Sequence, residues 1–301
     1  MAQRRSSMIN RSEISSHRET LEVSGHRLVY RTYTHADAST SRRLVLIHGA
    51  GVAGRYTWEA LQRFLGSWSE ILVPDLRGAG ETCSLDAEEH PFRVDELVDD
   101  MIALVDHLKW QQFDLGGYSL GGLVSMLMKQ RLGSRVQKQF LLESAVLDRL
   151  EWEETVQVRQ SFAKAAAVLH QDDAQRGIKQ FLDTISPNRR VSPQVEKLTI
   201  ERLGERAKGF AHALEAVTAA IHELNREELL AAQGDVSNFI GGLSVDPMHQ
   251  LHRALAQRMP NWHYFLIAGT DHSLPYQKPR QIAKLMDQEL ERYLMPHLTQ
   301  S

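Results

Sequence analysis

A Gly-x-Ser-x-Gly pentapeptide, Gly117-Tyr118-Ser119-Leu120-Gly121, lies between a short apolar run and a helical pattern. When a strand turns directly into a helix, the residue at the turn is strained and the neighbouring backbones come close together. Small residues are therefore favoured two positions away on either side. Such a turn holds its central side chain at the carboxyl end of the sheet, where open α/β sheets bind ligands. The pattern predicts that Ser119 is a nucleophile.

A serine hydroxyl is nearly unreactive at neutral pH until a base takes its proton, and histidine is the usual base. Of the 14 histidines, His272 is preferred because it follows the apolar run 264–268 in a loop. That loop is expected at the same edge of the sheet as Ser119. His249 and His252 fall in an expected helix instead. The sequence therefore predicts His272 as the base.

The imidazole in turn needs a carboxylate that fixes its tautomer and stabilises its positive charge. Asp246 is the preferred residue, because it lies between the serine and the histidine and follows the expected strand 238–241 through a short loop. Glu143, at the end of an earlier expected strand, is the alternative. Asp271 is disfavoured because a residue adjacent to the histidine normally points away from its ring.

Donors for a developing oxyanion are expected from the segment His48-Gly49-Ala50-Gly51, which follows the apolar run 44–47. Small residues there let backbone N–H groups approach a substrate. The N–H groups of Ala50 and of Leu120, the residue after the serine, are the predicted pair. His48 itself is expected to be structural.

The elements that position these residues alternate along the chain. Segments 20–23 and 27–33 are typical of a β-hairpin. Continuous apolar runs predict buried strands, and apolar residues at helical spacing predict helices. The expected strands are 44–47, 71–73, 113–115, 140–142, 238–241 and 263–268, and the expected helices are 94–108, 120–132 and one that begins at Pro279. The alternation predicts a doubly wound parallel sheet, interrupted by a helical insertion at 148–235.

Composition excludes several classes of protein. The chain has 301 residues, enough for an ample core, and its 35 basic and 38 acidic residues give a net charge of −3. This balance does not favour a nucleic-acid or membrane-surface partner. The single cysteine, Cys83, excludes an internal disulfide and argues against a zinc–cysteine site. No apolar run approaches the roughly 18 residues of a membrane span. The basic pair Arg4-Arg5 has no apolar segment after it, so a cytoplasmic protein with a polar tail at 1–18 is expected.

Taken together, these motifs resemble the α/β-hydrolase superfamily over residues 19–298, apart from the insertion. The segment Asp75-Leu76-Arg77-Gly78-Ala79-Gly80 is part of the likeness. The resemblance implies a mostly parallel eight-stranded sheet, a core formed by 19–147 and 236–301, and a helical cap at 148–235. It also implies that Asp75 and Arg77 brace the oxyanion loop. A serine at the elbow argues against the branches of the superfamily that use an aspartate nucleophile.

The predicted reaction is hydrolysis of a small to medium, partly apolar carboxylic ester through an acyl-enzyme, with no metal or organic cofactor. Five apolar residues of the insertion are candidates for the pocket wall: Phe162, Val168, Leu169, Phe181 and Ile185. The same triad could act on a carbon–carbon bond, a lactone or a thioester, or in cofactor-free perhydrolysis. A small-ligand receptor on the same fold is the alternative from another class. The oligomeric state stays open.

Overall fold

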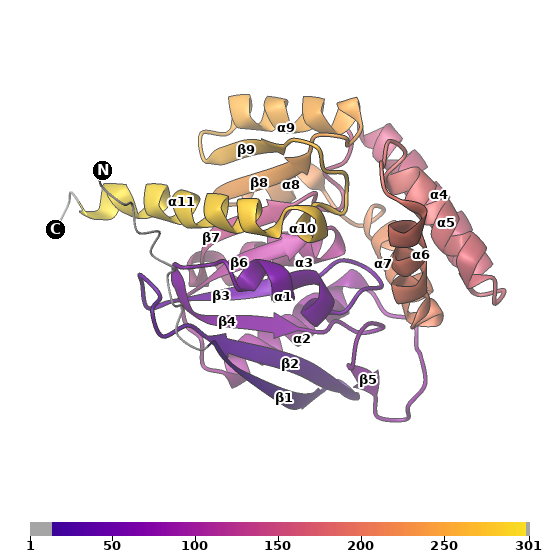
Figure 1. Cartoon of the computed structure of the whole chain (residues 1–301), viewed down its shortest axis with the longest axis horizontal. Helices are drawn as coiled ribbons and strands as arrows, with labels where there is room; N and C mark the ends of the chain where they lie inside the picture. Colours follow the sequence, from indigo (N-terminus) through magenta and orange to yellow (C-terminus); the bar gives the residue numbers. More distant parts are fainter. Residues whose placement is uncertain (1–13, 299–301) are drawn as a thin grey trace, which may run out of the picture.

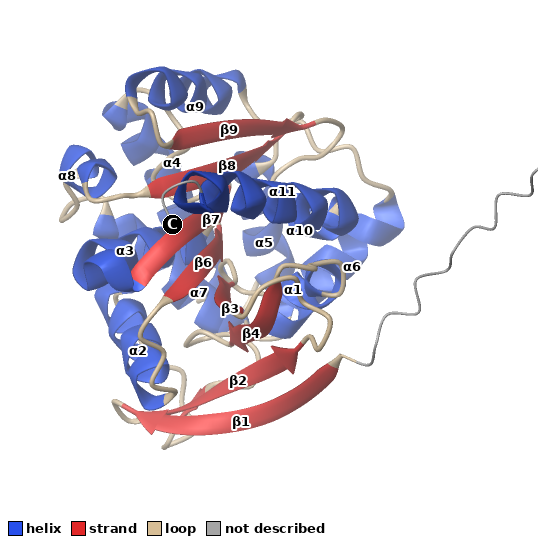
Figure 2. Cartoon of the chain, turned by 90° about the vertical axis from the view of Figure 1, so that its left-hand side faces the viewer, coloured by secondary structure: helices blue, strands red, loops and turns tan. Residues whose placement is uncertain are grey.

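The computed structural model describes residues 14–298, which form a nine-stranded sheet with helices on both faces (Figures 1 and 2). The strand order is β1-β2-β4-β3-β6-β7-β8-β9, and the short β5 pairs with β2. Neighbours from β4 to β9 are parallel, whereas β2 is antiparallel to β1 and β4. The strands are β1 (Ser15–Val23), β2 (His26–Thr34), β3 (Arg42–Ile47), β4 (Trp68–Pro74), β5 (Cys83–Ser84), β6 (Phe113–Tyr118), β7 (Val136–Leu142), β8 (Asp235–Gly241) and β9 (Trp262–Ile267). The predicted mostly parallel α/β architecture is confirmed, and β5 adds a ninth strand.

Helices cover the two faces of this sheet. The core helices are α1 (Gly54–Gln62), α2 (Val94–His107), α3 (Leu120–Leu132), α9 (Asp246–Arg258), α10 (Leu274–Gln277) and α11 (Pro279–Leu298). Alternate residues of β3 belong to different apolar clusters: Val45 and Ile47 pack with α2, α3 and α9, and Leu44 and Leu46 pack with α1, α10 and α11. Burial on both faces explains why this strand is a continuous apolar run.

The chain between β7 and β8 forms five helices, and four of them gather beyond the carboxyl ends of the parallel strands (Figure 1). They are α4 (Trp152–Leu169), α5 (Ala174–Ile185), α6 (Pro193–Gly204), α7 (Ala207–Ala220) and α8 (Arg226–Ala231). Several of these helices have a capping side chain at their N-terminus. Ser192, for example, accepts a hydrogen bond from the Val195 N–H, and Pro193 occupies the first turn of α6.

Helix α7 packs directly on the loop that follows β4. A Cβ atom at Gly209 would lie 2.1 Å from the carbonyl oxygen of Gly78, so only glycine permits this approach. The guanidinium of Arg206 donates to the carbonyl oxygens of Ala79 (3.0 Å) and Thr82 (2.5 Å) in the same loop. The helical insertion is therefore tied to the core beside the predicted oxyanion loop.

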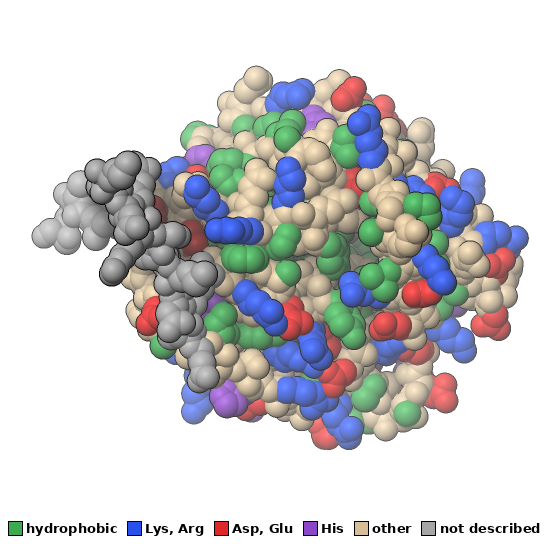
Figure 3. Space-filling view, viewed as in Figure 1, with side chains coloured by type: hydrophobic (Ala, Val, Ile, Leu, Met, Phe, Trp, Pro, Cys, Tyr) green, Lys and Arg blue, Asp and Glu red, His purple; other side chains and the backbone are tan. Residues whose placement is uncertain are grey.

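The predicted polar tail at 1–18 falls mostly on residues 1–13, outside the described part of the chain. Its last four residues do not form a tail, because Ser15–Arg18 pair with β2 as part of β1. Among the described residues, no helix combines the length and the apolar character that crossing a membrane requires. Acidic and basic side chains are intermixed on the face shown in Figure 3, in keeping with the near-neutral net charge.

The first prediction concerns Gly121, where α3 crosses β3. A Cβ atom there would lie 2.3 Å from the Ile47 carbonyl oxygen and 2.4 Å from that of His48. Alanine favours a helix over glycine by about 1 kcal/mol, but a clash with a fixed backbone outweighs this. We expect Gly121→Ala to lower the free energy of unfolding by about 1–3 kcal/mol, measured as a lower urea midpoint.

The matched control for this substitution is Gly66→Ala, whose new Cβ atom would have its nearest neighbour, a carboxylate oxygen of Asp287, at 3.6 Å. We expect its urea midpoint to stay close to that of the unchanged protein. Equal midpoints for Gly121→Ala and Gly66→Ala would contradict the close approach of α3 to β3.

Candidate active site

Ser119 stands at the turn between β6 and α3 with φ 53° and ψ −117°, a strained conformation for a residue other than glycine. Its N–H donates to the Leu142 carbonyl oxygen (3.0 Å), and its own carbonyl oxygen accepts from Gly122 and Ala145 (both 2.9 Å). A Cβ atom at Gly117 would lie 2.4 Å from the Gly121 carbonyl oxygen. The two glycines thus permit contacts between backbones, and the turn fixes the Ser119 side chain.

His272 follows β9, and its imidazole lies between Ser119 and a carboxylate. Its Nε2 is 3.2 Å from the Ser119 Oγ, and its Nδ1 is 2.7 Å from the Glu143 Oε2. A carboxylate is only an acceptor, so Nδ1 carries the proton and Nε2 is left to accept one from the serine hydroxyl. The His272 and Glu143 side chains are buried. This arrangement can remove a proton from Ser119 and stabilise the resulting imidazolium.

The structure does not bring Asp246, the preferred acid, to His272, and the carboxylate that faces the imidazole is that of the alternative, Glu143. Asp246 is exposed in the first turn of α9, where a carboxylate interacts favourably with the helix dipole. In the loop after β8 it is Ser244 that turns inward, and its hydroxyl donates to Glu143 Oε1. The Gly241 N–H donates to the same oxygen (2.8 Å).

Asp271 and Ser244 also lie near His272. Asp271 turns away from the imidazole, as expected, because its Oδ1 accepts from the Ser273 N–H (2.8 Å). Ser244 was missed by the sequence reasoning. Its one signal in the sequence is its position in the loop that connects β8 to the next helix.

The predicted oxyanion loop lies against the nucleophile. A Cβ atom at Gly49 would be 3.1 Å from the Ser119 Cβ, and Ala50 lines the same cavity as Ser119. Leu120 is the first residue of α3, where N–H groups have no acceptor within the helix. The structure therefore places both predicted donors, Ala50 and Leu120, next to Ser119, and their role on an oxyanion stays a prediction.

His48 holds this loop in place. Its Nδ1 donates to the Gly49 carbonyl oxygen (2.6 Å), and its Nε2 accepts from the Leu76 N–H (2.8 Å). Burial lowers the pKa of His48 in spite of the nearby Asp75 charge, so the ring is neutral and can accept as well as donate. The residue has the structural environment expected for it.

Asp75 and Arg77 fix the segments around the loop in different ways. Asp75 accepts from the Gly54 N–H (2.8 Å), directly after the loop. Arg77 donates to Asp100 (2.6 and 2.9 Å) and to Glu96 (2.8 Å) on α2. Asp75 therefore fixes the chain directly after the predicted oxyanion loop, whereas Arg77 anchors the following segment to α2.

Comparison with known proteins establishes the family. The profile of the alpha/beta hydrolase family matches residues 44–285. The chain belongs to this family. The match includes β3 from Leu44 onward, strands β4 to β9, the elbow and the segments that carry Glu143 and His272, and it leaves out β1 and β2.

Relatives within this family have several activities. The chain is 30% identical over 117 residues to a 2-hydroxymuconate semialdehyde hydrolase of Pseudomonas sp. (strain CF600), covering 38% of this chain and 40% of that protein. It is 25% identical over 206 residues to 3-oxoadipate enol-lactonase 2 of Acinetobacter baylyi, covering 67% and 72%. A thermophilic esterase from Thermogutta terrifontis superimposes with a TM-score of 0.68 at 18% identity, covering 92% and 99%, which shows a shared fold.

A cavity of about 50 Å³ lies beside Ser119. Its walls come from the oxyanion loop, the elbow, the His272 loop and the helical insertion. Apolar side chains of α5 and α6 form one side: Phe181, Leu182, Ile185 and Leu203. Phe181 and Ile185 are thus wall residues, as predicted. Phe162 instead packs against Phe181, with ring centroids 5.1 Å apart, and Leu169 is buried in the core.

Two tyrosines that the sequence analysis did not single out also line this cavity. Tyr118 packs beside the His272 ring, with centroids 5.1 Å apart, and burial raises its pKa well above the usual value. Burial also raises the pKa of Tyr276 to about 12, and its hydroxyl lies 2.9 Å from the Thr57 hydroxyl. Both phenols are neutral at physiological pH, so they add polar surface without charge.

The carboxyl of Glu143 stays ionised although it is buried. Burial alone would raise its pKa, but hydrogen bonds from His272, Ser244 and the Gly241 N–H, together with the charge on His272, outweigh the burial and hold the pKa below its usual value. An ionised carboxylate is the form that stabilises an imidazolium.

We expect Glu143→Gln to slow the reaction of Ser119 with a fluorophosphonate probe by at least on the order of 100-fold. An amide has one acceptor oxygen, which cannot serve His272, Ser244 and the Gly241 N–H as two carboxylate oxygens do. The exposed Asp246→Asn is the matched control, and its labelling rate should equal that of the unchanged protein. A larger loss in Asp246→Asn than in Glu143→Gln would contradict the assignment.

Another buried histidine, His252, makes stability depend on pH. Its Nδ1 accepts from the Asn238 amide, its Nε2 donates to the Leu147 carbonyl oxygen (2.9 Å), and burial lowers its pKa to about 4. The unfolded chain therefore binds this proton more readily than the folded protein between about pH 6.5 and 4.

We expect the free energy of unfolding to decrease as the pH is lowered from about 6.5 to 4, and His252 to account for on the order of 3 kcal/mol of this decrease at pH 4. Urea denaturation across the range measures the slope. In His252→Gln the slope should be smaller, because glutamine can keep the bond to Leu147 but does not titrate. An unchanged slope in that variant would contradict the buried neutral state.

Proposed function

We propose that this protein is a serine hydrolase in which Ser119 is the nucleophile, His272 the general base and Glu143 the acid that orients the base. The observation that supports this most strongly is the unbroken hydrogen-bonded series from the Ser119 Oγ through the two imidazole nitrogens to the Glu143 carboxylate, at 3.2 and 2.7 Å. Such a series converts a weakly nucleophilic hydroxyl into one that attacks a carbonyl carbon.

In the proposed reaction, His272 Nε2 takes the Ser119 proton as the oxygen attacks the ester carbonyl. The N–H groups of Ala50 and Leu120 then stabilise the negative oxygen of the tetrahedral intermediate. The imidazolium gives its proton to the leaving alcohol, and an acyl-enzyme remains on Ser119. Water repeats the same steps to release the acid, and the Glu143 carboxylate stays ionised throughout.

The size and lining of the cavity support a small to medium, partly apolar substrate. A volume of about 50 Å³ has room for a few water molecules, whereas ligand pockets usually measure roughly 300–1,000 Å³. An acyl group larger than this space would have to displace side chains of α5 and α6, such as Phe181 and Leu203. Because these side chains are apolar, an apolar acyl group is favoured over a charged one.

A cyclic ester is a second candidate substrate, because one of the relatives is an enol-lactonase. A lactone carries the same electrophilic carbonyl as an open-chain ester, and its alcohol stays attached to the acyl group after the first step. The same three residues would act in each case.

The test is a panel of chromogenic esters of increasing acyl length, with a lactone series beside it, assayed with the unchanged protein and Ser119→Ala. We expect turnover of short and medium acyl esters by the unchanged protein, and a loss on the order of 10³-fold or more in Ser119→Ala. The substitution removes only the hydroxyl oxygen, so the fold should be kept, as circular dichroism can check.

Equal rates in the two proteins would overturn Ser119 as the nucleophile. Tight binding of these compounds by both proteins, without turnover, would instead favour a receptor that uses the same pocket. Turnover of lactones alone would restrict the proposal to cyclic esters.

A further inference from the structure

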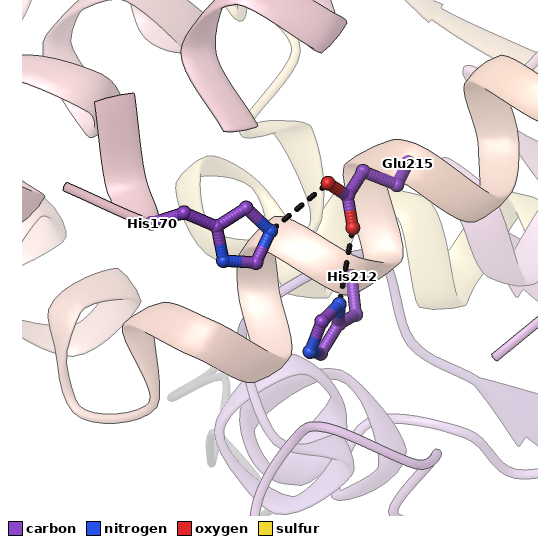
Figure 4. A group of neighbouring side chains, drawn as sticks. All are labelled: His170, His212 and Glu215. Atoms are coloured by element: carbon purple, nitrogen blue, oxygen red, sulfur yellow. Dashed lines mark hydrogen bonds and ion pairs between the residues drawn. The ribbon is translucent and has the colours of Figure 1, made fainter. Parts of the chain in front are cut away.

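Three potential metal ligands meet between α4 and α7, away from the residues around Ser119. His170 caps the carboxyl end of α4, and His212 and Glu215 lie three residues apart on α7. The carboxylate of Glu215 lies between the two imidazoles, 2.9 Å from His170 Nε2 and 3.0 Å from His212 Nδ1 (Figure 4). One ligand atom from each residue falls within 4.8 Å of the others. Two helices thus direct three donors at one point.

The chemistry of this donor set is that of a transition-metal site. Two imidazole nitrogens and a carboxylate oxygen are ligands that Zn²⁺ takes at about 2.0–2.2 Å, commonly with water in the fourth position. Tetrahedral bonds of that length hold the ligand atoms about 3.3 Å apart, close to the two separations between imidazole nitrogen and carboxylate oxygen, 2.9 and 3.0 Å. Small side-chain rotations would therefore exchange the two hydrogen bonds for bonds to an ion.

The surroundings keep part of this geometry in place and leave a path for an ion. The His212 side chain is 9% exposed and packs edge-on against Phe92, with ring centroids 6.4 Å apart. The side chains of His170 and Glu215 are 33% and 44% exposed. Residues three apart on a helix share a face, so His212 and Glu215 form one half of the site and His170 closes it.

The two hydrogen bonds contribute too little stability to explain why these three side chains are brought together. Exposed ion pairs contribute about 0–1 kcal/mol, and here one carboxylate is shared by two imidazoles from different helices. A divalent ion would use all three groups at once, and it would link the end of α4 to α7.

We propose that His170, His212 and Glu215 bind a divalent transition-metal ion, with Zn²⁺ as the best fit to these donors, and that the ion fastens α4 to α7. The link matters because α7 is the helix that lies on the core loops. A Cβ atom at Gly51 would be 2.6 Å from the Phe210 ring, next to the predicted oxyanion donor Ala50. The ion would thus stabilise the helix that covers this loop.

The test uses the full chain without a polyhistidine tag, freed of metal with a chelator that is then removed. Zn²⁺ binding is measured by titration calorimetry, and Co²⁺ binding by its visible absorption bands. We expect one ion per chain and a melting temperature that rises with Zn²⁺ concentration. His212→Ala and Glu215→Gln should each weaken binding by at least about tenfold and lose the rise in melting temperature.

His222→Ala is the matched control, since His222 is exposed just after α7 and is not part of the cluster. Its affinity for Zn²⁺ and its melting temperature should follow those of the unchanged protein. Glu215→Gln keeps the size of the side chain, so its loss of binding would not reflect misfolding. Absence of binding at micromolar Zn²⁺ would overturn the proposal. Equal binding by the unchanged protein and both cluster variants would overturn it as well, because the ion would then lie elsewhere.

Discussion

The contact between backbones at the β6–α3 turn is the constraint on which the site depends. Gly117 lets α3 lie close against β6, Gly121 lets α3 lie close against the end of β3, and Ser119 between them is held at φ 53°. In that conformation the serine side chain points away from the carboxyl end of the sheet. The carboxyl ends of β6, β7, β8 and β9 lie side by side at that edge, since all are parallel. Ser119, Glu143 and His272 can meet there although they are far apart in the chain.

The buried Glu143 carboxylate is charged, whereas two of the buried histidines around this turn are neutral. Glu143 keeps its charge because three donors surround its two oxygens. His48 and His252 stay neutral because burial lowers their pKa values, and neither ring has a carboxylate as a hydrogen-bond partner. Among these three histidines only His272 faces both a carboxylate and a hydroxyl. All three imidazoles are buried, so it is the hydrogen-bond partners that distinguish the one that can act as a base.

The strands, the elbow and the positions of Ser119 and His272 could be predicted because each depends on local sequence: apolar runs, a glycine-spaced turn and a loop after a strand. The choice between Asp246 and Glu143 could not. It depends on the direction in which a short loop turns, and a single residue separates Ser244, which faces Glu143, from Asp246, which lies in α9. Glu143 and Asp246 both lie between Ser119 and His272 in the chain, so the order of these residues does not indicate which carboxylate meets the imidazole.

The same limit applies to the helical insertion. Phe162 and Phe181 both occupy apolar positions of expected helices, and the sequence does not distinguish them. Of the two, only Phe181 on α5 lines the cavity, whereas Phe162 on α4 packs behind the Phe181 ring. The cluster of His170, His212 and Glu215 is likewise invisible in the sequence, since His170 approaches α7 only through the packing of α4 on α7. Residues that act across two packed helices have no signature in sequence spacing. The contacts that cover the catalytic edge and those that gather metal ligands therefore both follow from tertiary packing.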